Sequence, residues 1–284
     1  MIAFFGMGLL GSNFVHALRR RGEDVQVWNR SPAKAKALEA EGARAFADPA
    51  EAARGAARVH LTLTDDAAVD EVLERARPGI GASTVIVDHS TTSTQGVIAR
   101  IARWRERGIT YAHAPVFMAP QNARESTGLM LVSGPRSVVD PLRPVLAPMT
   151  GKVVDLGERP DAAAAFKLLG NLFLICMTTG LAEMLALAKA LDVAPAQAAA
   201  LFDQFNPGVT IPGRIKKMTD GAFEPPSWEL AMARKDARLM IDAATAAGVP
   251  LTMLPSIAAR MDAVIAEGHG AKDWTIIAKD VVAK

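Results

Sequence analysis

A short apolar run followed by a glycine-rich turn opens the chain and constrains its fold more than any other feature. Residues 2–5 are all apolar, residues 12–21 have an amphipathic helical pattern, and the six residues after Phe5 read Gly6-Met7-Gly8-Leu9-Leu10-Gly11. In a strand–turn–helix unit such glycines permit a tight turn, a close approach of the backbone to phosphate, and close helix packing. The N–H groups at the helix start then face an anion. We predict that these six residues bind a dinucleotide pyrophosphate, against the alternative of a flavodoxin-like domain with a chance glycine-rich turn.

The end of the second predicted strand, 25–28, indicates which dinucleotide binds. It is followed by Asn29-Arg30-Ser31, without the carboxylate that usually accepts hydrogen bonds from the ribose in NAD sites. Arg30 is suited to pair with a 2′-phosphate and stack on adenine, while Ser31 adds a hydroxyl and Lys34 lies one turn further on. We therefore predict that Asn29, Arg30, Ser31 and Lys34 bind NADP(H). In the alternative, these are solvated charges at a helix start that Ser31 caps before Pro32, and both interpretations can hold.

Size and composition favour a two-domain, helix-rich α/β protein. The 284 residues are 50% hydrophobic but only 5% aromatic, and the formal net charge is +2, too small to indicate nucleic acid or an anionic membrane. Cys176 is the only cysteine, which excludes a disulfide framework or a cysteine zinc site, and we expect it to be buried.

The longest apolar stretch, 168–187, is interrupted by Asn171, threonines and Glu183, so we expect a buried helix and not a membrane span. Because the first strand starts at residue 2, we also expect no signal peptide and a cytoplasmic protein.

Strand and helix patterns alternate in the first part of the chain and then stop. Strands are predicted at 2–5, 25–28, 43–46, 59–63, 84–88, 111–116, 129–132 and 152–156, the last of which closes the sheet, with helices between most of them. This alternation predicts an α/β Rossmann-type domain over residues 1–160, built on a doubly wound, mostly parallel sheet. Only helices are predicted afterwards, at 162–191, 195–205, 228–247, 254–267 and 274–283, which indicates an all-α domain over 161–284.

The helix predicted at 162–191 is apolar on most sides and must be buried by more than one neighbour. It therefore favours a homodimer or homotetramer, although the central helix of a monomeric bundle would show the same pattern.

Lys167 lies within this predicted helix, and Asn171 follows four residues later on the same face. Burial would lower the pKa of the lysine amine and make it a proton donor for a developing alkoxide, with Asn171 orienting it or bonding the substrate oxygen. The alternative is a snorkelling lysine at a domain junction.

Several motifs together resemble the β-hydroxyacid dehydrogenase family, which includes 3-hydroxyisobutyrate dehydrogenase and glyoxylate/succinic semialdehyde reductase. The resemblance covers nearly the whole chain and includes the glycine turn, Asp88-His89-Ser90-Thr91, Ala114-Pro115-Val116, the Lys167/Asn171 pair, Lys235-Asp236 and residues 268–273. It implies that Lys167 is the catalytic acid/base and that Asn171 is its partner at the substrate. It also implies that Thr64, Ser90, Thr91 and Lys235 lie beside the cofactor, and that the helical second domain forms dimers or tetramers.

One segment departs from that family, in which the corresponding Pro-Val pair is followed by a Ser-Gly-Gly that binds the substrate carboxylate. Here the chain reads Phe117-Met118-Ala119-Pro120. We expect Phe117, Met118 and Ala119 still to border the substrate together with Ser90, Lys167 and Asn171. The backbone N–H groups of Met118 and Ala119 remain able to hold an anion, and Gln121, Asn122 and Arg124 can recover polar recognition. The apolar rim nevertheless implies a larger or less polar substrate.

These features predict an NADP(H)-dependent oxidoreductase that interconverts a hydroxy acid or alcohol with its semialdehyde or keto form. An imine reductase and a non-catalytic NADP-binding protein remain as alternatives, while a 6-phosphogluconate dehydrogenase is disfavoured by the short chain. We expect no metal site, because His269 with Asp273 is a weak pattern and Asp236 suits an ion pair. His113 stands where the family usually has an acid, and we expect it to be a hydrogen-bonded histidine at a strand end.

Overall fold

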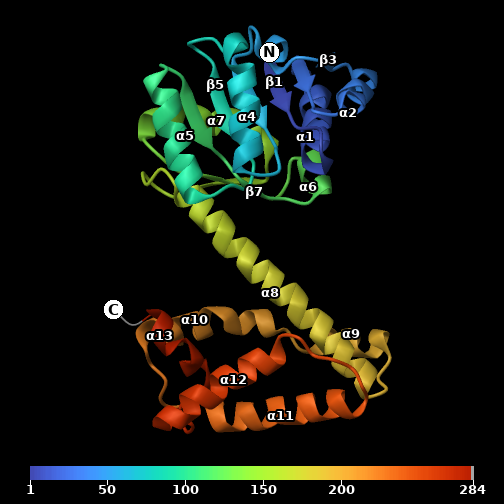
Figure 1. Cartoon of the computed structure of the whole chain (residues 1–284), viewed down its shortest axis with the longest axis vertical. Coiled ribbons are helices and arrows are strands. Elements are labelled where there is room, and N and C mark those ends of the chain that lie inside the picture. Colours follow the sequence, from blue (N-terminus) through green and yellow to red (C-terminus); the bar gives the residue numbers. More distant parts are fainter. Residues whose placement is uncertain (283–284) are drawn as a thin grey trace. The chain divides into compact units, whose positions relative to one another are not determined.

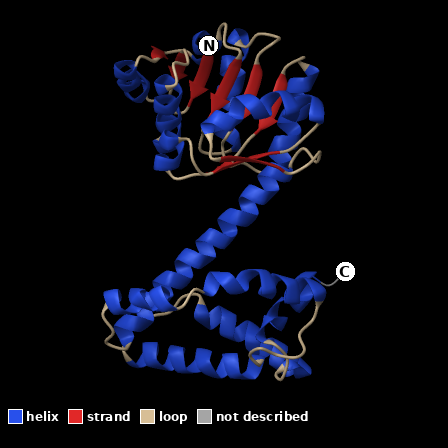
Figure 2. Cartoon of the chain, turned by 180° about the vertical axis from the view of Figure 1, so that it is seen from behind, coloured by secondary structure: helices blue, strands red, loops and turns tan. Residues whose placement is uncertain are grey.

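The computed structural model describes residues 1–282 and divides into two compact units, Met1–Leu172 and a second unit that starts at Phe173. The first unit contains a six-stranded parallel sheet of order β3-β2-β1-β4-β5-β6, seen as the red arrows of Figure 2. Its strands are β1 (Ile2–Phe5), β2 (Val25–Trp28), β3 (Arg44–Phe46), β4 (Arg58–Leu61), β5 (Val85–Asp88) and β6 (Thr110–His113). The predicted Rossmann-type fold is confirmed.

Helices cover both faces of this sheet because its strands are apolar on both sides, as parallel strands must be. On β1, Ile2 and Phe4 face a core shared with α1 (Leu9–Arg20) and α7 (Arg136–Leu146). Ala3 and Phe5 face the opposite core, which is closed by α3 (Pro49–Ala53), α4 (Asp66–Ala76) and α5 (Thr94–Glu106) (Figure 1). The shorter helices of this unit are α2 (Pro32–Lys36), α6 (Pro120–Glu125) and the 3₁₀ turns η1 (Ala37–Glu41), η2 (Arg77–Gly79) and η3 (Ala147–Met149).

The last strands of the first unit do not extend the main sheet. β7 (Val116–Phe117), β8 (Leu129–Val132) and β9 (Lys152–Asp155) form a separate three-stranded sheet, in which β7 is antiparallel and β9 parallel to β8. The expectations of one strand over 111–116 and of a final strand closing the main sheet are therefore wrong. Pro115 explains the break, because a proline has no N–H to donate to a strand ladder.

The second unit contains only helices among its described residues, as predicted. They are α9 (Pro195–Gln204), η4 (Pro207–Thr210), α10 (Ile211–Asp220), α11 (Leu230–Ala246), α12 (Leu254–Val264), η5 (Ile265–His269), η6 (Trp274–Ala278) and α13 (Lys279–Val282). The sequence reasoning missed α10, whose first turn contains Pro212 and Gly213 and so resembles a loop. The last predicted helix included Ala283, which lies outside the described residues.

The helix α8 (Ala162–Ala190) begins in the first unit and continues into the second. It is long and apolar enough to cross a membrane by length and composition alone, and most of its apolar side chains are exposed in this chain. Cys176 is also exposed. The expected burial of this helix and of its cysteine is therefore not observed within the single chain.

Candidate functional site

A cavity of about 470 Å³ lies where β1, β2, β4 and β5 end and their loops begin. In an open parallel sheet, this carboxyl edge is the expected place for a ligand. The lining includes Gly6, Gly8, Leu9, Leu10, Gly11, Asn29, Arg30, Ser31, Lys34, Thr64, Ser90 and Thr91. Every predicted cofactor residue except Met7 and Lys235 therefore borders one cavity.

The glycine turn has the geometry that its sequence predicted. Gly6 has a φ of +93°, and a Cβ atom there would lie 2.1 Å from the carbonyl oxygen of Thr62. A Cβ on Gly11 would lie 1.9 Å from the carbonyl oxygen of Gly6, so this glycine lets α1 pack against the turn. Gly8 differs because a Cβ there would meet no atom within 4 Å. Gly8 is also the N-cap of α1, so the open space before it faces the free N–H groups of that helix.

This difference predicts that alanine at two neighbouring glycines has separable effects. Gly11→Ala is expected to lower the melting temperature and weaken dinucleotide binding, because its Cβ overlaps backbone. Gly8→Ala is expected to keep the wild-type melting temperature and to weaken NADPH binding at least ~10-fold, because its Cβ occupies the space that the phosphates need. Thermal unfolding and NADPH fluorescence titration test both, and a Gly8→Ala variant that binds NADPH normally would contradict the assignment of this turn.

The loop after β2 is tied to the glycine turn. The Asn29 side chain accepts a hydrogen bond from the Met7 N–H at 2.9 Å and donates to the Ser31 carbonyl at 3.0 Å. Met7 itself is buried in the core, so its predicted contact with the dinucleotide is not supported. Arg30, Ser31 and Lys34 are exposed at the cavity. Ser31 precedes Pro32 at the helix start, but its hydroxyl makes no capping hydrogen bond there, which corrects the capping interpretation.

Sequence reasoning missed a second arginine at the same end of the cavity. The Arg75 guanidinium lies 5.3 Å from the centre of the Trp28 ring and 3.8 Å from a Glu71 carboxylate oxygen. All three residues line the cavity. The sequence contained a signal for this arginine. Glu71 and Arg75 are four residues apart on the helix that follows the predicted strand 59–63, and this strand ends at the same edge of the sheet.

The loop after β5 forms the other wall of the cavity. The Ser90 hydroxyl accepts a hydrogen bond from the Leu63 N–H at 2.8 Å, and the Ser90 N–H donates to Asp88 at 2.8 Å. Ser93, and not Ser90 or Thr91, caps α5 through the Gly96 N–H. Thr91 is exposed at the cavity, while Ser90 is held in place by Leu63 of the loop after β4 and by Asp88 at the end of β5.

Three buried histidines lie behind this wall. The Nδ1 atom of His60 lies 2.9 Å from Nε2 of His89, whose Nδ1 lies 2.7 Å from the Ala114 carbonyl oxygen. Burial lowers the pKa of His60 and His113 and lowers the pKa of His89 to about 4. A neutral His89 carries one N–H, and its Nδ1 must donate that hydrogen to the Ala114 carbonyl oxygen. Its Nε2 then accepts a hydrogen bond, so His60 donates to His89 from its own Nδ1. His113 lies 2.9 Å from the Ser90 carbonyl oxygen, which confirms the expectation of a hydrogen-bonded histidine.

Lys167 lies near the start of α8 and is half-buried, and burial lowers the pKa of its amine. Its Nζ atom lies 4.2 Å from the centre of the Phe117 ring. Asn171 is half-buried one helical turn later. Phe117, Met118, Ala119, Lys167 and Asn171 all belong to the first unit but lie outside the lining of the dinucleotide cavity.

The predicted residues of the second unit have simpler surroundings. Lys235 is exposed and forms an ion pair with Asp236 at 2.8 Å. Asp273 is fully buried and accepts hydrogen bonds from Lys217, Ser227 and Thr275, so it stabilises the fold. No group of three or more potential metal ligands occurs among residues 1–282.

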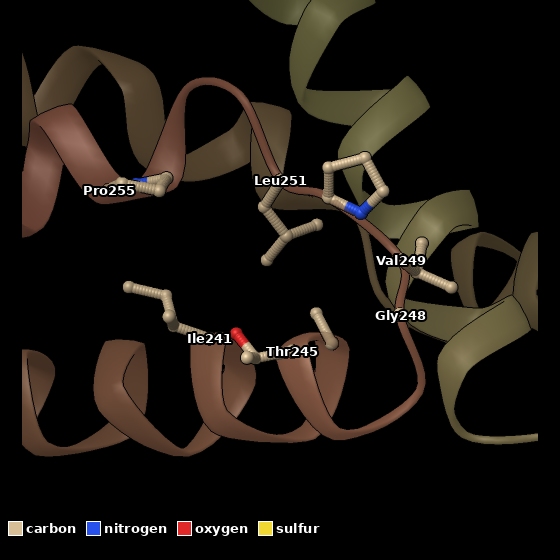
Figure 3. Close-up of a pocket in the computed structure, with 8 residues that line it drawn as sticks. Ile241, Thr245, Gly248, Val249, Leu251 and Pro255 are labelled. Carbon is tan, nitrogen blue, oxygen red and sulfur yellow. The ribbon is translucent and has the colours of Figure 1, made fainter.

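This unit also contains a second cavity of about 470 Å³ (Figure 3). Ile241 and Thr245 of α11 line it together with Leu251 of the following loop and Pro255 of α12. The lining contains no titratable side chain, so this cavity offers no acid/base chemistry.

Comparisons with known proteins agree with this geometry. A family described as the NAD binding domain of 6-phosphogluconate dehydrogenase matches residues 1–157, and one described as NAD-binding of NADP-dependent 3-hydroxyisobutyrate dehydrogenase matches residues 162–281. The chain is 29% identical to a probable 3-hydroxyisobutyrate dehydrogenase of Mycobacterium tuberculosis, over 97% of this chain and 96% of the relative. It is 25% identical to 3-sulfolactaldehyde reductase of Escherichia coli, over 99% and 95%. A solved imine reductase from Myxococcus stipitatus in complex with NADP⁺ shares the fold, with a TM-score of 0.90, 17% identity and 99% of each chain covered.

Proposed function

Since the chain belongs to the β-hydroxyacid dehydrogenase family of oxidoreductases, we propose that it uses NADPH to reduce a carbonyl substrate, with Lys167 as the proton donor. The observation that carries the proposal is the half-buried Lys167 amine on α8, whose pKa is lowered by burial, in a chain with a complete dinucleotide turn. When bound, NADPH supplies the hydride that adds to the carbonyl carbon. In the reverse direction, the neutral Lys167 amine would take the hydroxyl proton of an alcohol or hydroxy acid, whose carbon would give a hydride to NADP⁺.

The residues around the cavity at the carboxyl edge of the six-stranded sheet fit NADPH. Gly8 leaves open space at the N-terminus of α1 for a pyrophosphate. Arg30, Ser31 and Lys34 offer two cations and a free hydroxyl where a 2′-phosphate requires them, and no carboxylate directly follows β2. Thr64, Ser90 and Thr91 border the same cavity from the neighbouring strand ends. Lys235 remains a proposed cofactor contact from the second unit.

Lys167 and Asn171 carry the proton chemistry in this proposal. As the hydride reaches the carbonyl carbon, the C–O double bond becomes a single bond and negative charge develops on oxygen. The Lys167 ammonium donates a proton to that oxygen and regains one from solvent. Asn171 donates a hydrogen bond to the same oxygen or holds the lysine toward it, because the two side chains share one helical face.

Arg30 is expected to decide between the two nicotinamide dinucleotides. Arg30→Ala removes the planar cation from the 2′-phosphate and should raise the Kd for NADPH by roughly 10- to 100-fold, as for a charge-assisted bidentate contact. The Kd for NADH, which lacks that phosphate, should change less than ~3-fold on the same scale. Fluorescence titration with both cofactors checks this. Arg44→Ala, an exposed arginine outside the cavity, is the matched control, and equal losses for both cofactors would refute the role of Arg30.

A substrate panel tests the reaction itself. NADPH consumption is followed with semialdehydes, keto acids, larger uncharged aldehydes and cyclic imines, with NADH in parallel. Turnover of carbonyl compounds supports the proposal, and turnover of cyclic imines alone would replace it with imine reduction, which the fold shared with imine reductases keeps as the second candidate. Tight NADPH binding without turnover of any compound would favour a non-catalytic NADP-binding protein.

We also propose that α8 is covered by a second copy of the chain in a soluble, cytoplasmic homodimer. Leu169, Leu172 and Ile175 are 60% or more exposed, while Glu183 accepts backbone N–H bonds from residues 252–254. The C-terminal part of α8, around Glu183, is therefore part of the folded second unit. Sedimentation without detergent is expected to give twice the chain mass of 30.1 kDa, and Ile175→Asp should shift it toward monomer. A wild-type monomer, or a chain that needs detergent to stay in solution, would contradict this.

A further inference from the structure

Several polar groups in the segment that follows β7 already form hydrogen bonds with one another. The Ala119 N–H donates to the Asn122 side chain at 2.8 Å, and the Asn122 amide nitrogen donates to the Thr127 hydroxyl at 2.9 Å. The Gln121 side chain donates to Glu125. Of the two backbone N–H groups expected to hold a substrate anion, that of Ala119 is therefore used inside the protein. The side chains of Gln121 and Asn122, which were expected to provide polar recognition, are likewise engaged in these internal hydrogen bonds.

The one arginine of this segment is engaged with α1. The Arg124 carbonyl oxygen accepts a hydrogen bond from Arg20, and its guanidinium lies 3.5 Å from the Asn13 side-chain oxygen. Arg124 also lines a small pocket with His16, Arg19, Arg20 and Glu41 and not the dinucleotide cavity. Its charge is thus directed toward α1, and it is not a partner for a carboxylate beside Phe117.

Beside Lys167, the chain presents an apolar side chain, that of Phe117 at the end of β7. The Phe117 ring lies 4.2 Å from the Lys167 amine, and it fits a notch on α8 that a glycine leaves open. A Cβ on Gly170 would lie 2.3 Å from Cζ of that ring. Met118, next in the chain, packs on the core of the first unit. The ring is therefore seated between the loop and the helix that carries the lysine.

We propose that Phe117 is a specificity-determining residue that selects carbonyl substrates whose flank is apolar and uncharged and disfavours those with a carboxylate there. This inference rests on the proposed reduction by Lys167 and names its substrate class. A carboxylate beside the ring loses water, and hydrogen bonds inside the segment that follows β7 already use the Ala119 N–H and the Asn122 side chain that could otherwise bind it. The Lys167 amine lies 4.2 Å from the ring centre, and an ion pair with that carboxylate would hold the proton donor away from the carbonyl oxygen. An apolar flank instead buries surface against Phe117 and Met118.

The first test measures binding and needs no turnover. 1-Butanol and 4-hydroxybutanoate share a carbon chain and differ in a terminal methyl or carboxylate, and neither reacts while the enzyme holds NADPH. Ligand-observed NMR on the NADPH-loaded enzyme is expected to give at least ~10-fold tighter binding of 1-butanol. Phe117→Ser should reduce this preference at least ~10-fold, and Phe117→Leu, which keeps an apolar flank, should retain it.

The second test uses the matching aldehydes, butanal and succinic semialdehyde. Wild-type kcat/KM is expected to favour butanal, and Phe117→Ser to shift the ratio toward the semialdehyde with an unchanged NADPH Kd. Equal or tighter binding of 4-hydroxybutanoate, binding of neither alcohol, or a Phe117→Ser variant with the wild-type preference would overturn the inference. Absence of turnover with both aldehydes, in an enzyme that still prefers 1-butanol, would refute the proposed reaction and not the apolar selection.

Discussion

Replacing Lys167 with alanine is expected to lower kcat for carbonyl reduction by about 10²- to 10⁴-fold, the usual contribution of a positioned general acid. The NADPH Kd should stay at the wild-type value, because Lys167 does not line the dinucleotide cavity. Stopped-flow reduction and fluorescence titration measure the two quantities. Lys189→Ala is the matched control, since this exposed lysine lies at the other end of the same helix.

The same lysine predicts how the rate depends on pH. Reduction needs the ammonium form, so kcat should fall as the pH rises through the pKa of Lys167, whereas alcohol oxidation should rise over the same range. Because burial lowers that pKa, both changes should lie below the pH at which an exposed lysine titrates. A Lys167→Ala variant that keeps wild-type kcat, or a reduction rate that stays constant throughout this range, would show that another group supplies the proton.

Local patterns made most of the nucleotide-binding unit predictable. The glycine turn, its flanking strand and the loop 29–31 are contiguous, so spacing alone indicated that they line one cavity. The cap of α3 is equally local, since the Asp48 side chain accepts the Ala50 N–H at 2.9 Å. Such features depend on residues only a few positions apart, and few other local structures suit the same residues.

Features that depend on distant residues were not predictable in the same way. Nothing near Phe117 in the sequence indicates that Gly170 leaves room for its ring. The separate sheet of β7, β8 and β9 depends on how Pro115 redirects the chain after β6. The exposure of α8 was missed because an apolar pattern indicates that a surface needs covering without saying which chain covers it.

A buried arginine on α5 was also absent from the sequence prediction. The Arg100 side chain is fully buried, bonds Asp66 and lies 3.4 Å from Asp70. Gly96, one turn earlier, leaves the space for this pair, because a Cβ there would lie 1.9 Å from the Asp66 carboxylate. Asp66 also accepts the Ser93 N–H at 2.9 Å and so fixes the end of the loop that carries Ser90 and Thr91.

Asp66→Asn is expected to lower the free energy of unfolding by about 2 kcal/mol, less than the usual cost of breaking a fully buried ion pair, because the Asp66 side chain is 38% exposed. The substitution keeps the shape and the oxygen that accepts the Ser93 N–H, but it removes one of the two carboxylates that form ion pairs with the buried Arg100 guanidinium. Arg103→Gln is the matched control on the same helix. It removes a partly exposed pair with Asp70 and should cost at most about 1 kcal/mol. Urea unfolding at one protein concentration measures both.

A double variant separates the charge from the packing. Asp66→Asn combined with Arg100→Met removes both members of the ion pair and fills most of the arginine volume with an apolar side chain. If the cost of Asp66→Asn comes from an uncompensated buried charge, the double variant should be more stable than Asp66→Asn alone. Additive losses would instead mean that the two side chains stabilise the fold independently. Asp66 accepts the Ser93 N–H at the end of the loop that carries Ser90 and Thr91. The NADPH Kd of the double variant therefore also measures whether the Asp66–Arg100 ion pair is needed to position this loop.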